Sequence, residues 1–130
     1  MNNIIQVPVS VGELCDKYTI LLIKKEKITD EVKLSNIQKE LSYLESIVAD
    51  LNVPYSKIYE LKKVNEKLWD IEDNIRIKEM HKEFDNEFIQ LARSVYVTND
   101  MRFEIKNEIS KLSKSDILEV KSYNKYKDKD

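Results

Sequence analysis

Apolar residues recur at steps of three and four along most of this chain, and this spacing predicts amphipathic helices. The clearest series is a seam of coiled-coil type formed by Leu34, Ile37, Leu41, Leu44, Val48 and Leu51. Comparable series predict further helices over about residues 11–27, 58–80 and 86–112. The pattern therefore favours an all-α fold, an antiparallel bundle of about four helices.

Residues at the predicted boundaries support the same division. Ser10 and Glu13 have the spacing of a capping box at the start of the first helix. Pro54 disfavours helix in the residue before it and so ends the second helix. Asp85 is a suitable N-cap for the fourth helix. On the stripe of that helix, Thr98 and Arg102 occupy positions where aliphatic residues are expected.

The two ends of the chain have a different pattern. Residues 4–7 and 117–120 are apolar enough to form short extended segments, which could pair as a small two-stranded element. Residues 123–130 have the composition of a solvated tail. We therefore expect a single domain over residues 1–122.

Composition narrows the class of protein. The chain has 130 residues, 42% hydrophobic and 35% charged, with a formal net charge of −2. No basic stripe is present, so docking on nucleic acid or an anionic membrane is disfavoured. The longest apolar run is too short to cross a bilayer, and the N-terminus lacks the pattern of a signal peptide. We expect a cytoplasmic protein, and the single glycine excludes dinucleotide-binding fingerprints and P-loops.

Polar residues set at the edge of the apolar stripes are the candidate functional residues. The segment 65–76 places Asn65, Trp69, Glu72, Asp73 and Arg76 along one side of a helix. The second group lies mainly in the segment 93–102. Its members are Asp16, Lys17, Arg93, Tyr96, Asn99, Asp100 and Arg102.

The three arginines stand out because the chain has nineteen lysines. A planar, bidentate donor suits a ligand carboxylate or phosphate. It equally suits an internal network with Glu72, Asp73 or Asp100, which we consider the simpler interpretation. Arg102 lies on an apolar stripe and therefore requires a carboxylate or backbone acceptors. Asn65 and Asn99 can likewise bind a ligand or pair between helices.

Two acidic pairs provide weak candidates for a metal site. Glu13 and Asp16 share a face of the first helix, and Asp70 and Asp73 share a face of the third. Facing pairs of this kind can hold Mg²⁺, which would bridge substrate phosphate oxygens. Charged residues three apart are routine in helices, so we predict no cofactor in the simpler interpretation.

The remaining candidate side chains are aromatic, histidine and cysteine residues, for which a structural role is the simpler interpretation. Trp69, Tyr96 and Tyr18 could line a pocket, although aromatic residues at helical spacing are more often part of the core or its rim. His81 is the only histidine and is expected at the surface near a helix end. Cys15 faces inward in the first helix, where it acts as a small apolar residue, and no spacing supports a pair with His81.

Four segments resemble a family of short bacterial and phage proteins. They are Val9-Ser10-Val11-Gly12-Glu13-Leu14-Cys15-Asp16-Lys17, the segment from Val64-Asn65 to Leu68-Trp69-Asp70-Ile71-Glu72-Asp73, the segment from Leu91-Ala92-Arg93-Ser94-Val95-Tyr96 to Thr98-Asn99-Asp100, and Glu119-Val120-Lys121-Ser122-Tyr123. The resemblance covers nearly the whole chain. The family is uncharacterised, so the resemblance implies a shared helical fold and no activity.

Two classes of function remain open. The first is a small binding or assembly module without catalysis, homo-oligomeric or bound to a protein partner, acting through helix packing and the polar patch. The alternative is a small magnesium-dependent helical enzyme acting on a phosphorylated metabolite or nucleotide, with a chorismate-mutase-like catalyst as a distant third. An enzyme requires the carboxylates and arginines to converge on one cleft, whereas an assembly module requires them to satisfy one another while apolar residues stay exposed.

Overall fold

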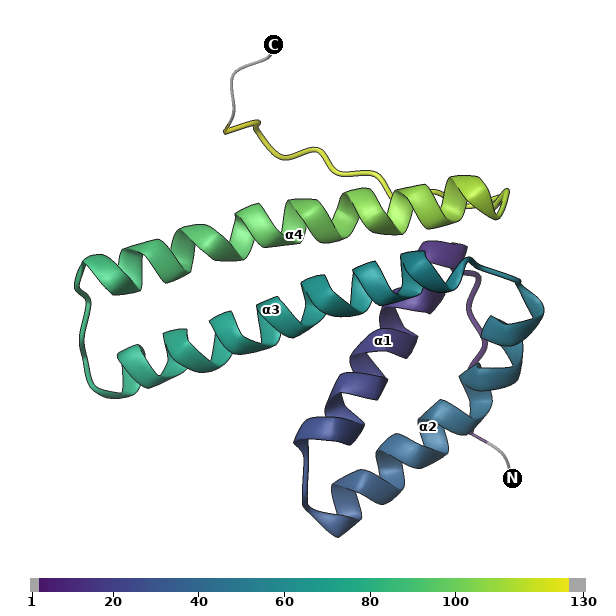
Figure 1. Ribbon diagram of the computed structural model, residues 1–130, viewed down its shortest axis with the longest axis horizontal. Helices are drawn as coiled ribbons and strands as arrows, with labels where there is room; N and C mark the ends of the chain where they lie inside the picture. Colours follow the sequence, from purple (N-terminus) through teal and green to yellow (C-terminus); the bar gives the residue numbers. More distant parts are fainter. Residues whose placement is uncertain (1–2, 127–130) are drawn as a thin grey trace.

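The computed structural model describes residues 3–126, and it confirms the all-α prediction over that range (Figure 1). It contains α1 (Val11–Lys27), α2 (Glu31–Asp50), α3 (Tyr55–Met80) and α4 (Asn86–Leu112), and no strand is present between residues 3 and 126. Each helix falls within a few residues of the range that the apolar periodicity predicts. The periodicity is informative here because each helix buries one face.

The predicted capping residues act at the helix starts. The Ser10 hydroxyl accepts from the Glu13 N–H at 3.1 Å, and the Asp85 carboxylate accepts from the Phe88 N–H at 3.0 Å. Asp30, which lies between α1 and α2, caps the second of these helices, because its carboxylate accepts from the Lys33 N–H at 2.9 Å. Side-chain oxygens thus satisfy backbone donors that would otherwise lack a partner in the first turn.

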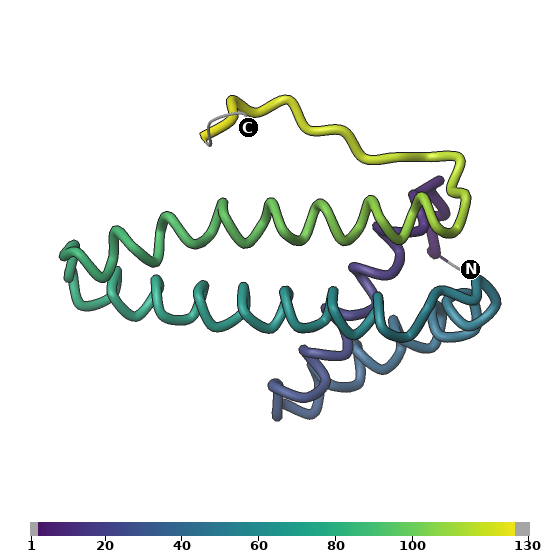
Figure 2. Tube along the Cα trace, turned by 45° about the horizontal axis from the view of Figure 1, so that its top comes forward, coloured from purple at the N-terminus to yellow at the C-terminus, as the bar shows by residue number. Residues whose placement is uncertain are grey.

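The four helices form two antiparallel hairpins rather than one evenly packed bundle (Figures 1 and 2). The helices α3 and α4 make a long hairpin, and α1 and α2 make a shorter one beside one end of it. The helix α1 contacts all three other helices, whereas α2 contacts α1 alone. The helix α1 therefore joins the two hairpins.

Two apolar clusters make up the core. One joins the three helices α1, α3 and α4 and contains Cys15, Leu61, Val64, Ile105 and Ile109. The other joins α1 to α2 and contains Leu21, Ile37 and Leu41. The predicted seam of α2 is therefore used inside the chain, against α1.

The crossing of α1 over α4 is unusually close at Gly12. A Cβ atom at this position would lie 2.1 Å from the Lys106 carbonyl oxygen and 2.8 Å from Ser110 Oγ. The Gly12 N–H donates to Ser110 Oγ at 2.8 Å, and the Val11 N–H donates to Ser115 Oγ at 3.1 Å. Ser110 of α4 and Ser115, which follows that helix, thus bind the first amides of α1. The close crossing requires a residue without a side chain at position 12.

The prediction that the two terminal segments form paired strands is wrong for the described residues. Residues 3–9 are extended and exposed, and the segment after α4 runs back beside that helix (Figures 1 and 2). Side-chain contacts hold the second segment, with Lys121 Nζ 4.9 Å from the Phe103 ring centroid and the Tyr126 ring 5.0 Å from that of Tyr96. A two-stranded ladder would be marginal by comparison. The solvated tail stays a prediction, and residues 127–130 lie outside the described range.

The hairpin of α3 and α4 extends well beyond its contact with α1 (Figure 1). We call residues 72–97 the distal hairpin; none of its side chains is buried. Within the described part of the chain, no helix is both long and apolar enough to span a bilayer.

Candidate functional site

The central polar contact joins Asp16 of α1 to Arg102 of α4. Asp16 is 1% exposed, and its Oδ1 atom accepts from Arg102 Nε at 2.9 Å. Arg102 Nη2 forms an ion pair with the other carboxylate oxygen, so the contact is bidentate. These hydrogen bonds raise the pKa of Arg102. Arg102 thus has the carboxylate that its place on the apolar stripe requires, and the partner is Asp16 rather than Glu72, Asp73 or Asp100.

Asn65 of α3 completes this network. Its Nδ2 atom donates to Asp16 Oδ1 at 2.9 Å and to Thr19 Oγ1 at 3.0 Å, while the Thr19 hydroxyl donates to the Asp16 carbonyl at 2.8 Å. A carboxylate can only accept, so these bonds fix the orientation of the Asn65 amide. The Asp16 network, as we call Asp16, Thr19, Asn65 and Arg102, therefore ties three helices together.

A second charged cluster lies beside it on α4. The Lys106 side chain is 7% exposed, and its Nζ atom lies 2.7 Å from a Glu13 oxygen and 2.9 Å from a Glu119 oxygen. Burial by itself would lower the pKa of Lys106, but the two carboxylates outweigh it and the pKa is raised. The contact with Glu119 is an ion pair without hydrogen-bond alignment. Lys106 thus holds the C-terminal segment against α1 and α4.

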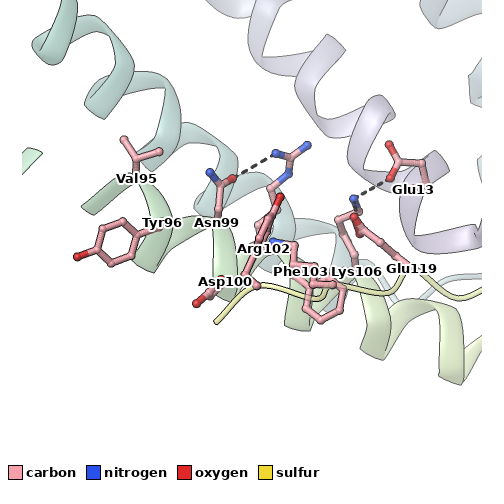
Figure 3. A pocket seen from close by; sticks show the side chains of 11 residues that line it. Glu13, Val95, Tyr96, Asn99, Asp100, Arg102, Phe103, Lys106 and Glu119 are labelled. Atoms are coloured by element: carbon pink, nitrogen blue, oxygen red, sulfur yellow. Dashed lines mark hydrogen bonds and ion pairs between the residues drawn. The ribbon is translucent and has the colours of Figure 1, made fainter. Parts of the chain in front are cut away.

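Two hollows flank the Asp16 network, and Arg102 lines both. The first, of about 610 Å³, lies between α4 and the C-terminal segment, and Tyr96, Asn99 and Asp100 line it together with Lys106 and Arg102. Figure 3 shows the Asn99 amide facing the Arg102 guanidinium and the Lys106 ammonium facing Glu13. The distance from Arg102 Nη1 to Asn99 Oδ1 is 3.4 Å.

The second hollow, of about 410 Å³, lies between α1 and α3, and we call it the Trp69 hollow. Its lining combines apolar and polar side chains. They are Ile20, Ile23, Asn65, Leu68, Trp69, Glu72, Asp73, Arg76 and Arg102. Five predicted site residues from α3 therefore share one hollow with Arg102, because they follow one another along one face of that helix.

The remaining predicted residues do not join either hollow. Lys17 is exposed and pairs with Glu40 of α2 at 2.7 Å. Arg93 is exposed and lies in a shallow depression of α3 and α4 with Thr98. Asp16 is beneath the surface and lines no hollow described above. The predicted patch is therefore divided between an interior network and separate surfaces.

The acidic pairs considered for a metal site are not brought together as one cluster. Asp16 is bound to Arg102 and Asn65, and Glu13 is bound to Lys106. Asp70 is exposed. Over residues 3–126, no group of three or more Asp, Glu, His or Cys side chains is placed to hold a metal ion.

The two candidate nucleophilic groups lie in unrelated places. Cys15 is fully buried, and burial raises the pKa of its thiol to about 11, with the Asp16 charge adding to the effect. His81 is exposed in the connection between α3 and α4, at the end of the hairpin away from α1 (Figure 1). This arrangement offers no Cys–His pair.

Sequence reasoning missed the structural roles of Lys106, Ser110 and Glu119. One signal was available for Lys106, because it follows Arg102 by four residues and therefore lies on the same side of α4. Glu119 could not be found in this way, since it lies in an extended segment with no fixed periodicity. Thr98 lies on the predicted stripe of α4, and its buried Oγ1 has no hydrogen-bond partner among the described residues.

Comparison with known proteins provides a family and no closer relative. No curated protein and no solved structure matches the chain. Residues 5–128 match the family of unknown function DUF6165. Because this match covers nearly the whole sequence, the chain belongs to the family DUF6165.

Proposed function

We propose that this protein is a small helical binding module that docks a helix of another polypeptide on its distal hairpin. The observation that carries the proposal is the absence of any buried side chain between residues 72 and 97, although apolar residues line both helices there. Large side chains are notably exposed, with Ile77 at 48%, Met80 at 69%, Phe84 at 57% and Ile89 at 50%.

The physical reason is that two helices alone cannot enclose a stripe wider than their line of contact. At the other end of the hairpin, α1 supplies the third helix, and Leu61 and Ile109 become fully buried there. In the distal hairpin Ile75, Leu91 and Val95 remain half-buried. Each large apolar side chain gains about 1.5–3 kcal/mol on complete burial, so a third helix would be stabilised by several such contacts.

The polar network supports the same interpretation. Asp16 accepts from both Arg102 and Asn65, and Glu13 is occupied by Lys106. Two of the four carboxylates on which the magnesium-dependent alternative depends, Asp16 and Glu13, are therefore engaged in holding the helices at fixed positions. We propose that the Asp16 network sets the angle between the hairpins and so presents the distal hairpin for binding.

Selection from a displayed library of helical peptides tests this proposal. The bait is the full chain, and Ala92→Arg places a long charged side chain on an exposed site of α4, one turn from Phe88 and Tyr96. Ala49→Arg is the matched control, because Ala49 is also exposed but lies on α2. We expect enrichment of peptides with apolar residues at helical spacing, lost with Ala92→Arg and kept with Ala49→Arg.

Self-association is measured in parallel by sedimentation velocity over a hundredfold concentration range. A dimer that Ala92→Arg dissociates would identify a second copy as the docked polypeptide. A monomer that enriches no helical peptide dependent on Ala92 would contradict the proposed function.

A further inference from the structure

The Trp69 hollow has an unusual balance of hydrogen-bonding groups. Its apolar lining residues include Ile20, Ile23 and Leu68, and the half-buried residue Trp69 also lines it. Asp73 lies one helical turn from Trp69 on the same side of α3. The hollow therefore places an aromatic ring and a carboxylate next to an apolar surface.

The arginines of the hollow have their charges offset by carboxylates. Arg102 is bound to Asp16 through both carboxylate oxygens, and Arg76 lies 3.5 Å from Glu72. Asp73 has no ion-pair partner among residues 3–126. The two pairs, Arg102 with Asp16 and Arg76 with Glu72, each have a formal charge of zero. The charge of Asp73 is therefore not compensated by either arginine.

The amide of Asn65 also lines this hollow. Asn65 is 5% exposed, and both of its donated hydrogen bonds go to Asp16 and Thr19. Its Oδ1 atom therefore accepts no hydrogen bond from the described residues, while the residue lines the hollow. This oxygen is therefore available to a donor group of a molecule bound in the hollow.

We propose that the Trp69 hollow binds an alkylammonium group, with the cation between the Trp69 ring and the Asp73 carboxylate and the alkyl chain along Ile20 and Ile23. An ammonium ion is attracted to the face of an indole ring and to a carboxylate, and it accepts no hydrogen bond from the paired arginines. The same chemistry is found in a free alkylamine and in a lysine side chain of a docked helix. The site does not depend on the proposed function, because a free amine can occupy it by itself.

Three probes of equal chain length test the proposal: hexylammonium, hexanol and hexanoate, which carry a positive, a neutral and a negative head group. Trp69 is the only tryptophan, so its emission reports directly on the hollow. The full chain is titrated with each probe at constant ionic strength, and N-acetyltryptophanamide corrects for quenching by free probe. We expect a dissociation constant for hexylammonium about tenfold lower than that for hexanol, with hexanoate weakest.

The decisive variant is Asp73→Asn, since Asp73 is exposed and its replacement leaves the core unchanged. This variant should reduce the preference for hexylammonium over hexanol from about tenfold to about threefold, a difference that the aromatic ring alone can supply. Glu45→Gln is the control, because it removes one charge from an exposed site on α2. Amide chemical shifts of Trp69 and its neighbours should follow the same titration.

Other outcomes would overturn the proposal. Equal affinity for hexylammonium and hexanol would mean that the hollow selects apolar chains only, and tightest binding of hexanoate would make Arg102 the recognition group. No change in Trp69 emission with any probe would exclude the site. None of these results affects the proposed function, which depends on Ala92. If a selected peptide loses affinity when its lysines become norleucine, in the native chain but not in Asp73→Asn, the cation comes from a docked helix.

Discussion

The bidentate contact between Arg102 and Asp16 should make an important contribution to stability, and replacing Arg102 with lysine is the sharpest perturbation of it. Lysine keeps the positive charge but has a single nitrogen in place of the planar fork. The Asp16 carboxylate, in a residue that is 1% exposed, would lose one of the two charge-assisted hydrogen bonds that Arg102 donates to it. Such a bond contributes about 1.5–3 kcal/mol.

The partial exposure of Arg102 places the expected effect within that range. Its side chain is 29% exposed, so water can replace part of what is lost, and we expect Arg102→Lys to lower the free energy of unfolding by about 2 kcal/mol. Arg102→Met removes the charge and leaves Asn65 as the remaining donor to the Asp16 side chain. Breaking a buried ion pair in this way costs about 3–5 kcal/mol, and we expect the lower end.

A double-mutant cycle separates the pair from its surroundings. Asp16→Asn, Arg102→Met and the double variant are unfolded in urea, with helical ellipticity as the signal and m-values compared to verify two-state behaviour. The double variant should lose about 2 kcal/mol less than the sum of the single variants, because neither charge is left without its partner. Total stability of a domain of this size is about 5–15 kcal/mol, so these differences are measurable.

An internal control is available for the same chemical change. Arg76 is 79% exposed and lies 3.5 Å from Glu72, so Arg76→Lys should change stability by less than about 0.5 kcal/mol. If Arg102→Lys proved as mild as Arg76→Lys, or if the cycle gave no coupling, the Asp16 network would not be holding the helices together. The bidentate contact would then be incidental to the fold.

Three further predictions concern other parts of the structure. Gly12→Ala should lower the free energy of unfolding, measured in urea, by about 2 kcal/mol or more, because the new Cβ would lie 2.1 Å from the Lys106 carbonyl oxygen. The cost of this clash exceeds the gain of about 1 kcal/mol in helix propensity. A stabilised variant would contradict the close crossing of α1 and α4. Lys106→Met should lower the heteronuclear {1H}–15N nuclear Overhauser effects along the C-terminal segment, since Glu119 loses its ion pair; unchanged values would show that the ring contacts suffice. At pH 8, Cys15 of the folded protein should react with a disulfide reagent far more slowly than Cys15 of the urea-unfolded chain, because the pKa of the thiol in the folded state is about 11. Stability should be unaffected by this group below pH 9.0 and should fall from there towards pH 11, since the unfolded thiol loses its proton first; rapid labelling of the native thiol would refute its burial.

The helices could be predicted from the sequence because their signals are local. Apolar spacing of three and four residues identifies a helix that buries one face, and capping residues such as Ser10 and Asp85 act on amides three positions away. Pro54 likewise restricts its immediate neighbour. The number, order and limits of the helices therefore follow from interactions within a few residues.

The candidate site was predictable only in part. The row from Asn65 to Arg76 could be recognised because residues on one side of a helix stay together in any fold. The partner of Arg102 could not, because Asp16 is 86 positions away and every nearby carboxylate was an equally good candidate. Glu119 belongs to an extended segment that no helical period places.

What the sequence by itself determined is the set of helices, the face that each buries, and the need of Arg102 for a carboxylate, because these depend on local geometry and on the cost of burying a charge. Only the tertiary structure decided that α1 joins two hairpins, that α2 uses its seam on α1, and that the distal hairpin is left uncovered. These outcomes depend on which apolar faces meet, and faces of similar composition can pack in several arrangements with similar burial. The close passage at Gly12 and the fit of Asp16 to Arg102 distinguish among such arrangements, and both exist only once distant segments are in contact.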